Sequence, residues 1–308
     1  MEIRKVAASR PFRAGSGAIY FCRMRTGDNR VASLLSLYER ELADRFSSGE
    51  VKAIVRSVFN DRLGWDAADI ELRRNEALSE SELLEVYLPL KRIRSGEPLQ
   101  YILGRTYFHG LEIEVAPGVL IPRPETEEMI DLILKSGIDP GSIVDIGTGS
   151  GCIALALKKS FPGSRVIGID VSNEALAIAQ CNGERLSIDV EWQKGDVLDP
   201  TFALPKQIDL IVSNPPYVPR SESRSLSTQV RDHEPHVALF VDDEDPLKFH
   251  RAIADHAFRS LSPNGSIWFE GHYFHSCAVA DLMDEKGFQD VRLIMDMAGQ
   301  DRFITARK

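Results

Sequence analysis

Hydrophobic residues recur along the first third of the chain with the spacing of helices that bury one face. One stripe comprises Val31, Leu34, Leu35, Tyr38, Leu42 and Phe46, and a second comprises Val51, Ile54, Val55, Val58 and Phe59. Ser79 and Glu82 then have the spacing of a capping box, which predicts a third helix that Pro89 should kink or interrupt. Residues 28–100 are therefore expected to form a small helical bundle, serving as a substrate-recognition domain, a lid or an oligomerisation element.

The pattern changes after residue 100. Apolar positions alternate with polar ones, and Gly104, Gly110 and Gly118 supply turn residues, which predicts a β-hairpin linker over residues 101–120. Short β-branched runs then alternate with helix-length segments, and the runs expected to form strands are 143–146, 165–169, 190–193, 208–213, 266–270, 291–295 and 302–305. This alternation predicts a mainly parallel sheet with helices on both faces. Because the last two runs have no helix between them, they should form a hairpin that places one antiparallel strand in the sheet.

Composition narrows the functional classes. The chain has 308 residues, enough for two domains, and 37 Lys and Arg against 46 Asp and Glu give a net charge of -9. This balance argues against a protein that binds mainly by neutralising phosphates, so no direct nucleic-acid substrate is expected. The four cysteines form no C-x-x-C pair, so neither a disulfide framework nor a zinc knuckle is predicted, and a reducing cytoplasm fits best. No apolar run reaches the roughly 20 residues that cross a bilayer, so no membrane partner is expected.

The first 27 residues stand apart from these patterns. They are rich in arginine, as transit peptides are, but their apolar segment at residues 18–22 is too short for a signal peptide. We expect a disordered tail, or a start codon assigned too early with Met24 as the true start.

The tetrapeptide Asn214-Pro215-Pro216-Tyr217 follows a β-branched run and is the most informative motif of the chain. The two prolines stiffen the backbone and remove donors, so that carbonyl oxygens are presented as acceptors. The Asn214 side-chain oxygen and the Pro215 carbonyl can each accept one hydrogen of an –NH2 group, while Tyr217 offers a flat aromatic wall. An isolated N-P-P would be an ordinary turn. Here the motif predicts chemistry on a nitrogen, because the neighbouring strand ends carry a ligand-binding pattern.

Three further strand ends carry residues suited to a nucleotide-like ligand. Asp145 precedes a glycine-rich loop that opens a helix, Gly147, Thr148, Gly149, Ser150 and Gly151, with the spacing G-x-G-x-G instead of the G-x-G-x-x-G of dinucleotide binders. Asp170 ends the second strand, where a carboxylate can hold both ribose hydroxyls, and Asp196 with Val197 follows the third, where they suit an adenine. Asp145 could balance a cationic end of the ligand. Any one of these aspartates alone would more often be a helix cap.

Together these motifs resemble the S-adenosylmethionine-dependent N-methyltransferases of the seven-strand class. Within that class the chain resembles the bacterial release factor glutamine methyltransferases, through the further segments 96–104 (GEPLQYILG), 117–127 (PGVLIPRPETE) and 230–239 (VRDHEPHVAL). The resemblance covers most of residues 28–308. Gln300, where a basic residue is usual, and Gly271-His272-Tyr273, in place of Ile-Gly, depart from the family pattern. The fold class implied is α/β, with a seven-stranded Rossmann-like methyltransferase sheet over residues 121–308 and a small N-terminal helical bundle.

The resemblance implies a function and its participants. S-adenosylmethionine is the expected cofactor, and the expected reaction methylates N5 of the glutamine in the Gly-Gly-Gln loop of peptide chain release factors, with the enzyme acting as a monomer. We assign catalysis to Asn214, Pro215 and Tyr217, and substrate binding to these residues and Pro216. Cofactor binding is assigned to Asp145, Gly147, Thr148, Gly149, Ser150, Gly151, Asp170, Asp196, Val197 and Asn214.

No general base is assigned, because a methylated, protonated amide loses its proton readily. Glu125 and Glu270 lie in matching motifs but could equally be structural partners. The pairs His233/His236 and His272/His275 lack a third ligand, so no metal is assigned and surface roles are expected for all histidines. Three other functions stay open: a ribosomal-protein glutamine methyltransferase, an adenine-N6 DNA methyltransferase that flips its target base, and a dehydrogenase or non-catalytic binding module.

Overall fold

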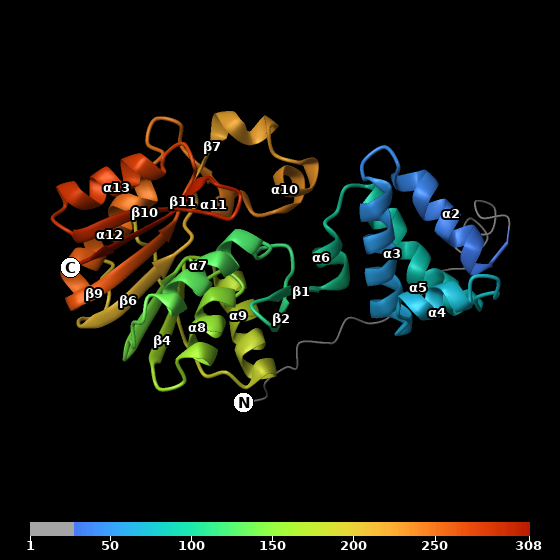
Figure 1. Ribbon diagram of the computed structural model, residues 1–308, viewed down its shortest axis with the longest axis horizontal. Helices are drawn as coiled ribbons and strands as arrows, with labels where there is room; N and C mark the ends of the chain where they lie inside the picture. Colours follow the sequence, from blue (N-terminus) through green and yellow to red (C-terminus); the bar gives the residue numbers. More distant parts are fainter. Residues whose placement is uncertain (1–27) are drawn as a thin grey trace. The chain divides into compact units, whose positions relative to one another are not determined.

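The chain divides into two units between Leu103 and Gly104. A computed structural model describes residues 28–308, and the tail expected over residues 1–27 lies outside the described residues. Each of the two units is drawn in Figure 1.

The first unit is a helical bundle. Its helices are α2 (Val31–Leu42), α3 (Ser48–Leu63), α4 (Ala67–Leu72), α5 (Glu80–Arg94) and α6 (Leu99–Leu103). Both apolar stripes predicted from the sequence contribute to one core, and the capping box of Ser79 and Glu82 starts α5. Pro89 does not interrupt α5, because the helix buries Val86, Leu90 and Ile93 on either side of it in that core.

The second unit begins with a two-stranded hairpin, β1 (Arg105–Phe108) and β2 (Leu111–Glu114), which are antiparallel. His109 and Gly110 connect the strands, and both have positive φ, as a type I′ hairpin turn requires. The hairpin is shorter than the 101–120 segment expected to contain it. Residues 101–103 belong to α6 instead, since Tyr101 and Ile102 are buried as part of that helix.

A seven-stranded sheet forms the centre of the second unit. Its strands are β3 (Ser142–Ile146), β4 (Arg165–Asp170), β5 (Glu191–Lys194), β6 (Ile208–Ser213), β9 (Leu261–Glu270), β10 (Gln289–Met295) and β11 (Asp301–Arg307), in the order β10-β11-β9-β6-β3-β4-β5. All seven predicted strands are confirmed. Strand β11 is antiparallel to both of its neighbours, β9 and β10, while the other pairings in this sheet are parallel, so the predicted antiparallel strand is confirmed as well.

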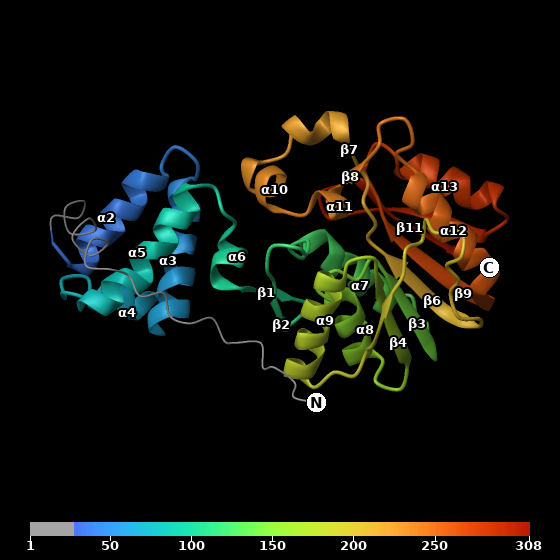
Figure 2. The ribbon, with the colours of Figure 1, turned by 180° about the vertical axis from the view of Figure 1, so that it is seen from behind.

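Helices cover both faces of the sheet, as Figures 1 and 2 show from opposite sides. Helices α7 (Pro124–Lys135), α8 (Cys152–Ser160) and α9 (Asn173–Leu186) lie on one face, and α12 (Lys248–Ser260) and α13 (Ser276–Glu285) lie on the other. The alternation of side chains along β3 matches this arrangement: Val144 and Ile146 belong to the core under α12 and α13. Right-handed crossovers between parallel strands place the helices in this way.

The long polar loop expected after β6 has structure of its own. It contains β7 (Val218–Pro219), the 3₁₀ helix η1 (Arg220–Arg224), α10 (Thr228–His233), α11 (His236–Leu239) and β8 (Phe240–Val241). Strands β7 and β8 pair in parallel and close the excursion, and Val218, Leu239 and Phe240 form a small core beneath it. The two ends of the excursion are therefore held together, and its first strand, β7, directly follows the tetrapeptide.

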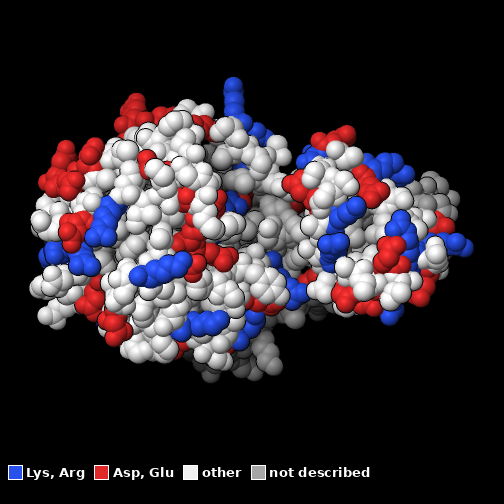
Figure 3. Space-filling model, in the orientation of Figure 1, with Lys and Arg blue, Asp and Glu red and all other residues white. Residues whose placement is uncertain are grey.

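Side-chain chemistry on the described surface is mixed. On the face drawn in Figure 3, Lys and Arg are interspersed with Asp and Glu. No helix within residues 28–308 combines the length and apolar character needed to cross a membrane. The surface role expected for all histidines is wrong for His250, His256 and His272, which are buried. The first two lie on the sheet-facing side of α12, where each Nε2 finds a backbone carbonyl oxygen, that of Glu270 or Val197, at 3.2 Å.

Candidate active site

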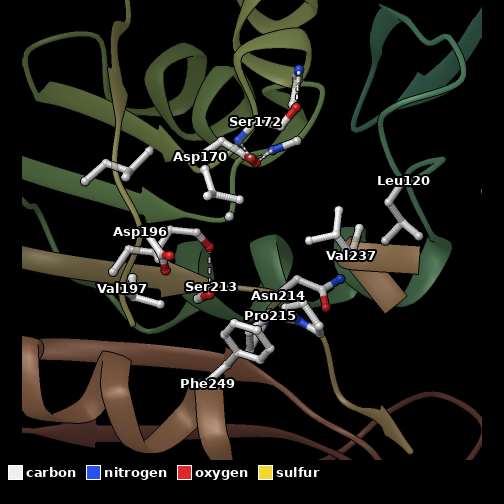
Figure 4. Close-up of a pocket in the computed structure, with 18 of the residues that line it drawn as sticks. Leu120, Asp170, Ser172, Asp196, Val197, Ser213, Asn214, Pro215, Val237 and Phe249 are labelled. Carbon is white, nitrogen blue, oxygen red and sulfur yellow. Dashed lines mark hydrogen bonds between the residues drawn. The ribbon is translucent and has the colours of Figure 1, made fainter. Parts of the chain in front are cut away.

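A pocket opens at the carboxyl ends of β3, β4, β5 and β6, the edge at which open α/β sheets bind ligands. Its cavity has a volume of about 130 Å³ and is lined mainly by apolar side chains and backbone. The structure brings eight of the predicted site residues to its wall: Gly147, Gly149, Asp170, Asp196, Val197, Asn214, Pro215 and Pro216. Figure 4 shows Asp170 and Asp196 on one side of this pocket and Asn214 with Pro215 on another.

The glycine-rich loop exposes its backbone to the pocket. Gly147, Gly149 and Gly151 all have positive φ, a conformation that side chains disfavour. A Cβ placed on Gly149 would find no atom within 4 Å, so the main chain there is open to a ligand. A Cβ on Gly151 would instead lie 2.8 Å from Trp192, so this glycine serves the packing of the loop and does not line the pocket.

Asp145 lies beneath the pocket and is not part of its wall. Its side chain is fully buried, and Oδ2 accepts hydrogen bonds from the Thr148 hydroxyl at 2.5 Å and the Ala154 N–H at 3.2 Å. Burial raises the pKa of Asp145 to about 7. Thr148 and Ser150 are buried too and also stay off the wall. Their positions suit support of the loop from below, which differs from the direct ligand contact expected from the sequence.

Asp170 points into the pocket and is held by two backbone donors. Its Oδ2 accepts the Gly149 N–H and its Oδ1 accepts the Ser172 N–H, both at 2.9 Å. Burial raises the pKa of Asp170 above its usual value, while these two hydrogen bonds oppose the rise. Each carboxylate oxygen keeps a further acceptor site, which is what a pair of vicinal hydroxyls would require. Asp196 is tied similarly, through the Leu198 N–H at 2.9 Å.

The tetrapeptide lies directly beside the glycine-rich loop. Strands β3 and β6 are parallel neighbours, and the last residue of each pairs with the other, Ile146 with Ser213. Gly147 and Asn214 therefore leave the sheet together, and a Cβ on Gly147 would lie 4.0 Å from the Asn214 carbonyl oxygen. The ligand loop and the predicted nitrogen site thus border one cavity.

The Asn214 amide is oriented by residues outside the pocket. Its Nδ2 donates to Thr126 Oγ1 at 3.1 Å, and the Thr126 hydroxyl donates to Glu270 Oε2 at 2.7 Å. Within residues 28–308 no hydrogen bond engages Asn214 Oδ1. That oxygen is the available acceptor of the side chain.

Tyr217 is not on the wall of this pocket, where the sequence suggested an aromatic surface for a flat group. Its hydroxyl donates to Glu270 Oε1 at 3.0 Å, and its ring packs against the small core of Val218, Leu239 and Phe240. Burial raises the pKa of Tyr217 well above its ordinary value, and the neighbouring Glu270 charge adds to this, so the phenol stays a donor. Tyr217 thereby anchors the end of the tetrapeptide.

Sequence reasoning missed the apolar part of the wall. Leu120, Val237, Phe249 and Ile253 line the pocket, and they come from the 117–127 segment, α11 and α12. Leu120 and Val237 lie inside segments that carried the family resemblance, which could have marked them. Phe249 and Ile253 follow an ordinary helical stripe and carry no such signal.

The histidine pairs do not assemble a metal site in the described part of the chain, where no three His, Cys, Asp or Glu side chains are grouped to hold an ion. His236 Nε2 lies 2.8 Å from the Arg231 carbonyl oxygen, and His272 Nε2 lies 3.2 Å from Glu222. Each ring therefore has a local partner.

The pocket fits S-adenosylmethionine by the chemistry of its donors and walls. Asp170 offers a carboxylate with free acceptor sites for a ribose, Val197 and Phe249 offer apolar surface for a base, and the loop from Gly147 to Gly149 offers open backbone. A polar group capable of accepting an N–H lies at the far end, on Asn214.

Comparisons with known proteins agree with this fit. The Methyltransferase small domain matches residues 126–231, and the PrmC N-terminal domain matches residues 33–104. A release factor glutamine methyltransferase of Bacteroides thetaiotaomicron is 41% identical over 280 residues, covering 91% of this chain and 100% of its own. Those of Flavobacterium psychrophilum and Enterococcus faecalis are 38% and 34% identical, over 87% and 84% of this chain and 95% and 94% of their own.

Proposed function

The chain belongs to the release factor glutamine methyltransferase family, and from this premise we propose that the pocket at Asn214 is where it methylates the side-chain amide of a release factor glutamine. The activity is S-adenosylmethionine-dependent methyl transfer to protein. The observation that carries the assignment of the site is the free Oδ1 of Asn214 at the border of the cavity beside the glycine-rich loop. The acceptor we propose is N5 of the glutamine in a Gly-Gly-Gln loop.

The cofactor end of the pocket is assigned from its residues. We assign the ribose to Asp170, the adenine edge to Asp196 and its apolar faces to Val197 and Phe249. Asp145, Thr148, Ser150 and Gly151 support this end without lining it. When bound, S-adenosylmethionine supplies a methyl group on a positively charged sulfur, and its transfer to an amide releases one proton.

The acceptor end must orient a poor nucleophile. The lone pair of an amide nitrogen is delocalised into its carbonyl, so the nitrogen needs a fixed position and favourable charges around it. Asn214 Oδ1 and the Pro215 carbonyl can each accept one of the two N–H hydrogens, which aims the nitrogen and stabilises positive charge developing on it. Fixing reactants in this way can supply up to about 7–11 kcal/mol of the barrier, and preorganised polar groups about 3 kcal/mol each.

No side chain is assigned as general base. Glu270 is buried behind Thr126 and Tyr217 and does not reach the pocket wall. The proton of a methylated, protonated amide is acidic enough to leave to water. We therefore assign Glu270 a role as hydrogen-bond acceptor of Thr126 and Tyr217, and none in proton transfer.

The partner in this reaction is a peptide chain release factor. We propose that the enzyme works on it as a monomer, which light scattering of the pure protein would test directly: a stable dimer would contradict it. A cytoplasmic location is the matching proposal, because the substrate is a translation factor.

One experiment tests the function. The purified protein is incubated with methyl-labelled S-adenosylmethionine and, in parallel, with a bacterial release factor, a ribosomal-protein fraction and duplex DNA. We expect label only in the release factor, and mass spectrometry should place it on the Gly-Gly-Gln glutamine. A release factor with that glutamine changed to alanine is the matched control and should stay unlabelled. Label confined to ribosomal protein or DNA would overturn the proposal.

A further inference from the structure

Behind the pocket, three side chains form a directed chain of hydrogen bonds that ends on Asn214. Glu270 Oε2 accepts the Thr126 hydroxyl at 2.7 Å, and Thr126 Oγ1 accepts from Asn214 Nδ2 at 3.1 Å. Thr126 lies in the first turn of α7, Glu270 ends β9, and Asn214 follows β6. Neither Thr126 nor Glu270 lines the pocket, and their exposed fractions are 2% and 1%. This chain of bonds acts on the pocket only through the orientation of one amide.

The direction of the chain is set by the number of hydrogens available. A threonine hydroxyl has one hydrogen, and an ionised carboxylate has none. Once the Thr126 hydrogen is given to Glu270, Thr126 can only accept, so Asn214 must turn its NH2 toward Thr126. The Asn214 oxygen then faces the other way, as the only acceptor of that side chain left for a ligand. Reversing the chain would present NH2 to the pocket instead.

We propose that Thr126 and Glu270 are positioning residues that fix the hydrogen-bond polarity of Asn214, so that the site selects a glutamine, which carries N–H donors, over a glutamate, which carries only acceptors. This inference rests on the proposed function of the pocket and specifies how that site recognises its acceptor. A carboxylate of the same shape would set its oxygens against Asn214 Oδ1 and the Pro215 carbonyl. Sites that hydrogen-bond a substrate N–H strongly reject analogues that lack this group.

Two hydroxyl donors set the hydrogen-bonding role of the Glu270 carboxylate. Thr126 donates to Oε2, and Tyr217 donates to Oε1 at 3.0 Å. Burial raises the pKa of Glu270, and the charge of Glu125 adds to this rise. The two hydrogen bonds and the Arg302 guanidinium oppose the rise by favouring the ionised form. The Glu270 backbone oxygen lies 3.2 Å from His250 Nε2. Tyr217 and Thr126 thus both give their hydrogens to one carboxylate, which keeps each of them from donating elsewhere.

The test interrupts this chain of hydrogen bonds and leaves the residues of the pocket wall unchanged. Thr126→Val keeps the shape of the side chain and deletes the hydroxyl, while Thr126→Ser keeps the hydroxyl and is the matched control. Two quantities are measured for each protein. The first is kcat with a release factor. The second is the dissociation constant of a release factor carrying Gly-Gly-Glu divided by that of one carrying Gly-Gly-Gln, both measured in the presence of S-adenosylhomocysteine. We expect Thr126→Val to lower kcat about 10- to 100-fold and to reduce the ratio by about tenfold, as the loss of one polar contact does. Thr126→Ser should stay within about threefold of the parent in both.

Two results overturn the inference. One is a Thr126→Val enzyme with both quantities unchanged. The other is a lower kcat with the ratio unchanged, because a merely structural role would slow the enzyme without altering its preference for amide over carboxylate. The S-adenosylhomocysteine dissociation constant and the melting temperature report whether each variant is folded. If Thr126→Val does not fold, Thr126→Ala replaces it, with the same expected changes in kcat and in the ratio. Failure of the parent enzyme to label any release factor would remove the proposed function, whereas a labelling parent with an unaffected Thr126→Val variant would remove this inference alone.

Discussion

The guanidinium of Arg123 lies 2.7 Å from the carboxylate of Glu234, and the other oxygen of that carboxylate accepts the Ile121 N–H at 3.2 Å. The Glu234 side chain is 1% exposed. These contacts join the 117–127 segment to the excursion between β7 and β8. They fix Leu120 and Val237, which line the pocket from the two sides of this junction. One buried carboxylate therefore holds two walls of the site.

Removal of the Glu234 carboxylate should destabilise the second unit. Glu234→Ala leaves the Ile121 N–H and a half-buried guanidinium without their partner, and we expect a loss of about 2 kcal/mol in the free energy of unfolding. Arg165 and Glu191 form an exposed pair that serves as the control, and Glu191→Ala should cost about 0.5 kcal/mol or less. Urea unfolding measures both. Equal losses in the two variants would refute the structural role of Glu234.

Asn214→Ala should nearly abolish methyl transfer and largely spare cofactor binding. The substitution removes the acceptor of one substrate N–H, and the expected loss in kcat is at least about 100-fold. Single-turnover assays with labelled cofactor measure transfer, and calorimetry measures binding of S-adenosylhomocysteine. Normal turnover in the variant would remove the role assigned to this residue.

Asp170→Ala should weaken the cofactor and leave the fold intact. Its carboxylate is placed by Gly149 and Ser172 to accept two hydroxyls, and loss of such charge-assisted bonds should raise the dissociation constant of S-adenosylhomocysteine about 10- to 100-fold. Asp199 also accepts a backbone N–H but lies off the pocket wall, so Asp199→Ala should bind the ligand like the parent protein. A similar affinity for all three proteins would contradict the assignment.

Gly168→Ala should destabilise the sheet by crowding. Gly168 lies in the middle of β4, and a Cβ there would collide with the Trp192 ring, whose Cε3 would be 2.6 Å away. Overpacking of this kind costs about 1–3 kcal/mol. A Cβ on Gly163 would meet nothing within 4 Å, so Gly163→Ala is the matched control and should change stability little. A melting temperature unchanged in Gly168→Ala would show that Trp192 can move aside.

Asp145 should make stability depend on pH near neutrality. Burial raises its folded pKa to about 7, whereas an unfolded aspartate has a pKa of about 3.9. The protonated folded form is therefore favoured at low pH, and its contribution to stability is lost as pH rises from about 4 to about 7, by up to about 1.4 kcal/mol per pH unit.

Asp145→Asn does not titrate and provides the reference. Between pH 5 and pH 7, without cofactor, the free energy of unfolding of the parent protein should fall by about 2 kcal/mol relative to that of the variant. Chemical denaturation at several pH values measures the difference. A constant difference across this range would mean that Asp145 is ionised throughout.

Much of the second unit could be predicted because its strands are short apolar runs bounded by turn residues. The apolar runs from β3 to β11 are recognisable in the sequence as strands. Because the carboxyl ends of parallel strands lie at one edge of a sheet, Asp170, Asp196 and Asn214 could be placed together. Asp145 itself does not line the pocket, because side chains alternate between the faces of a strand. Asp145 points under α8, where it accepts the Ala154 N–H.

The features that escaped prediction depend on contacts between residues far apart in the chain. Thr126 donates a hydrogen bond to Glu270, which lies 144 positions later in the chain, and no local sequence pattern around either residue predicts this contact. Phe249 reaches the pocket from a helix whose apolar stripe mainly indicates core. The predicted hairpin segment includes the last three residues of the short helix α6, because a helix of five residues is too short to show a helical period.

Ile146 pairs with Ser213, so the loops after β3 and β6 begin side by side at one edge of the sheet. The loop after β3 is proposed to bind the methyl donor, and the loop after β6 is proposed to bind the recipient amide. Under the proposed assignment, substitutions among the residues after Ser213 change the recipient side of the site and leave the donor side unaltered.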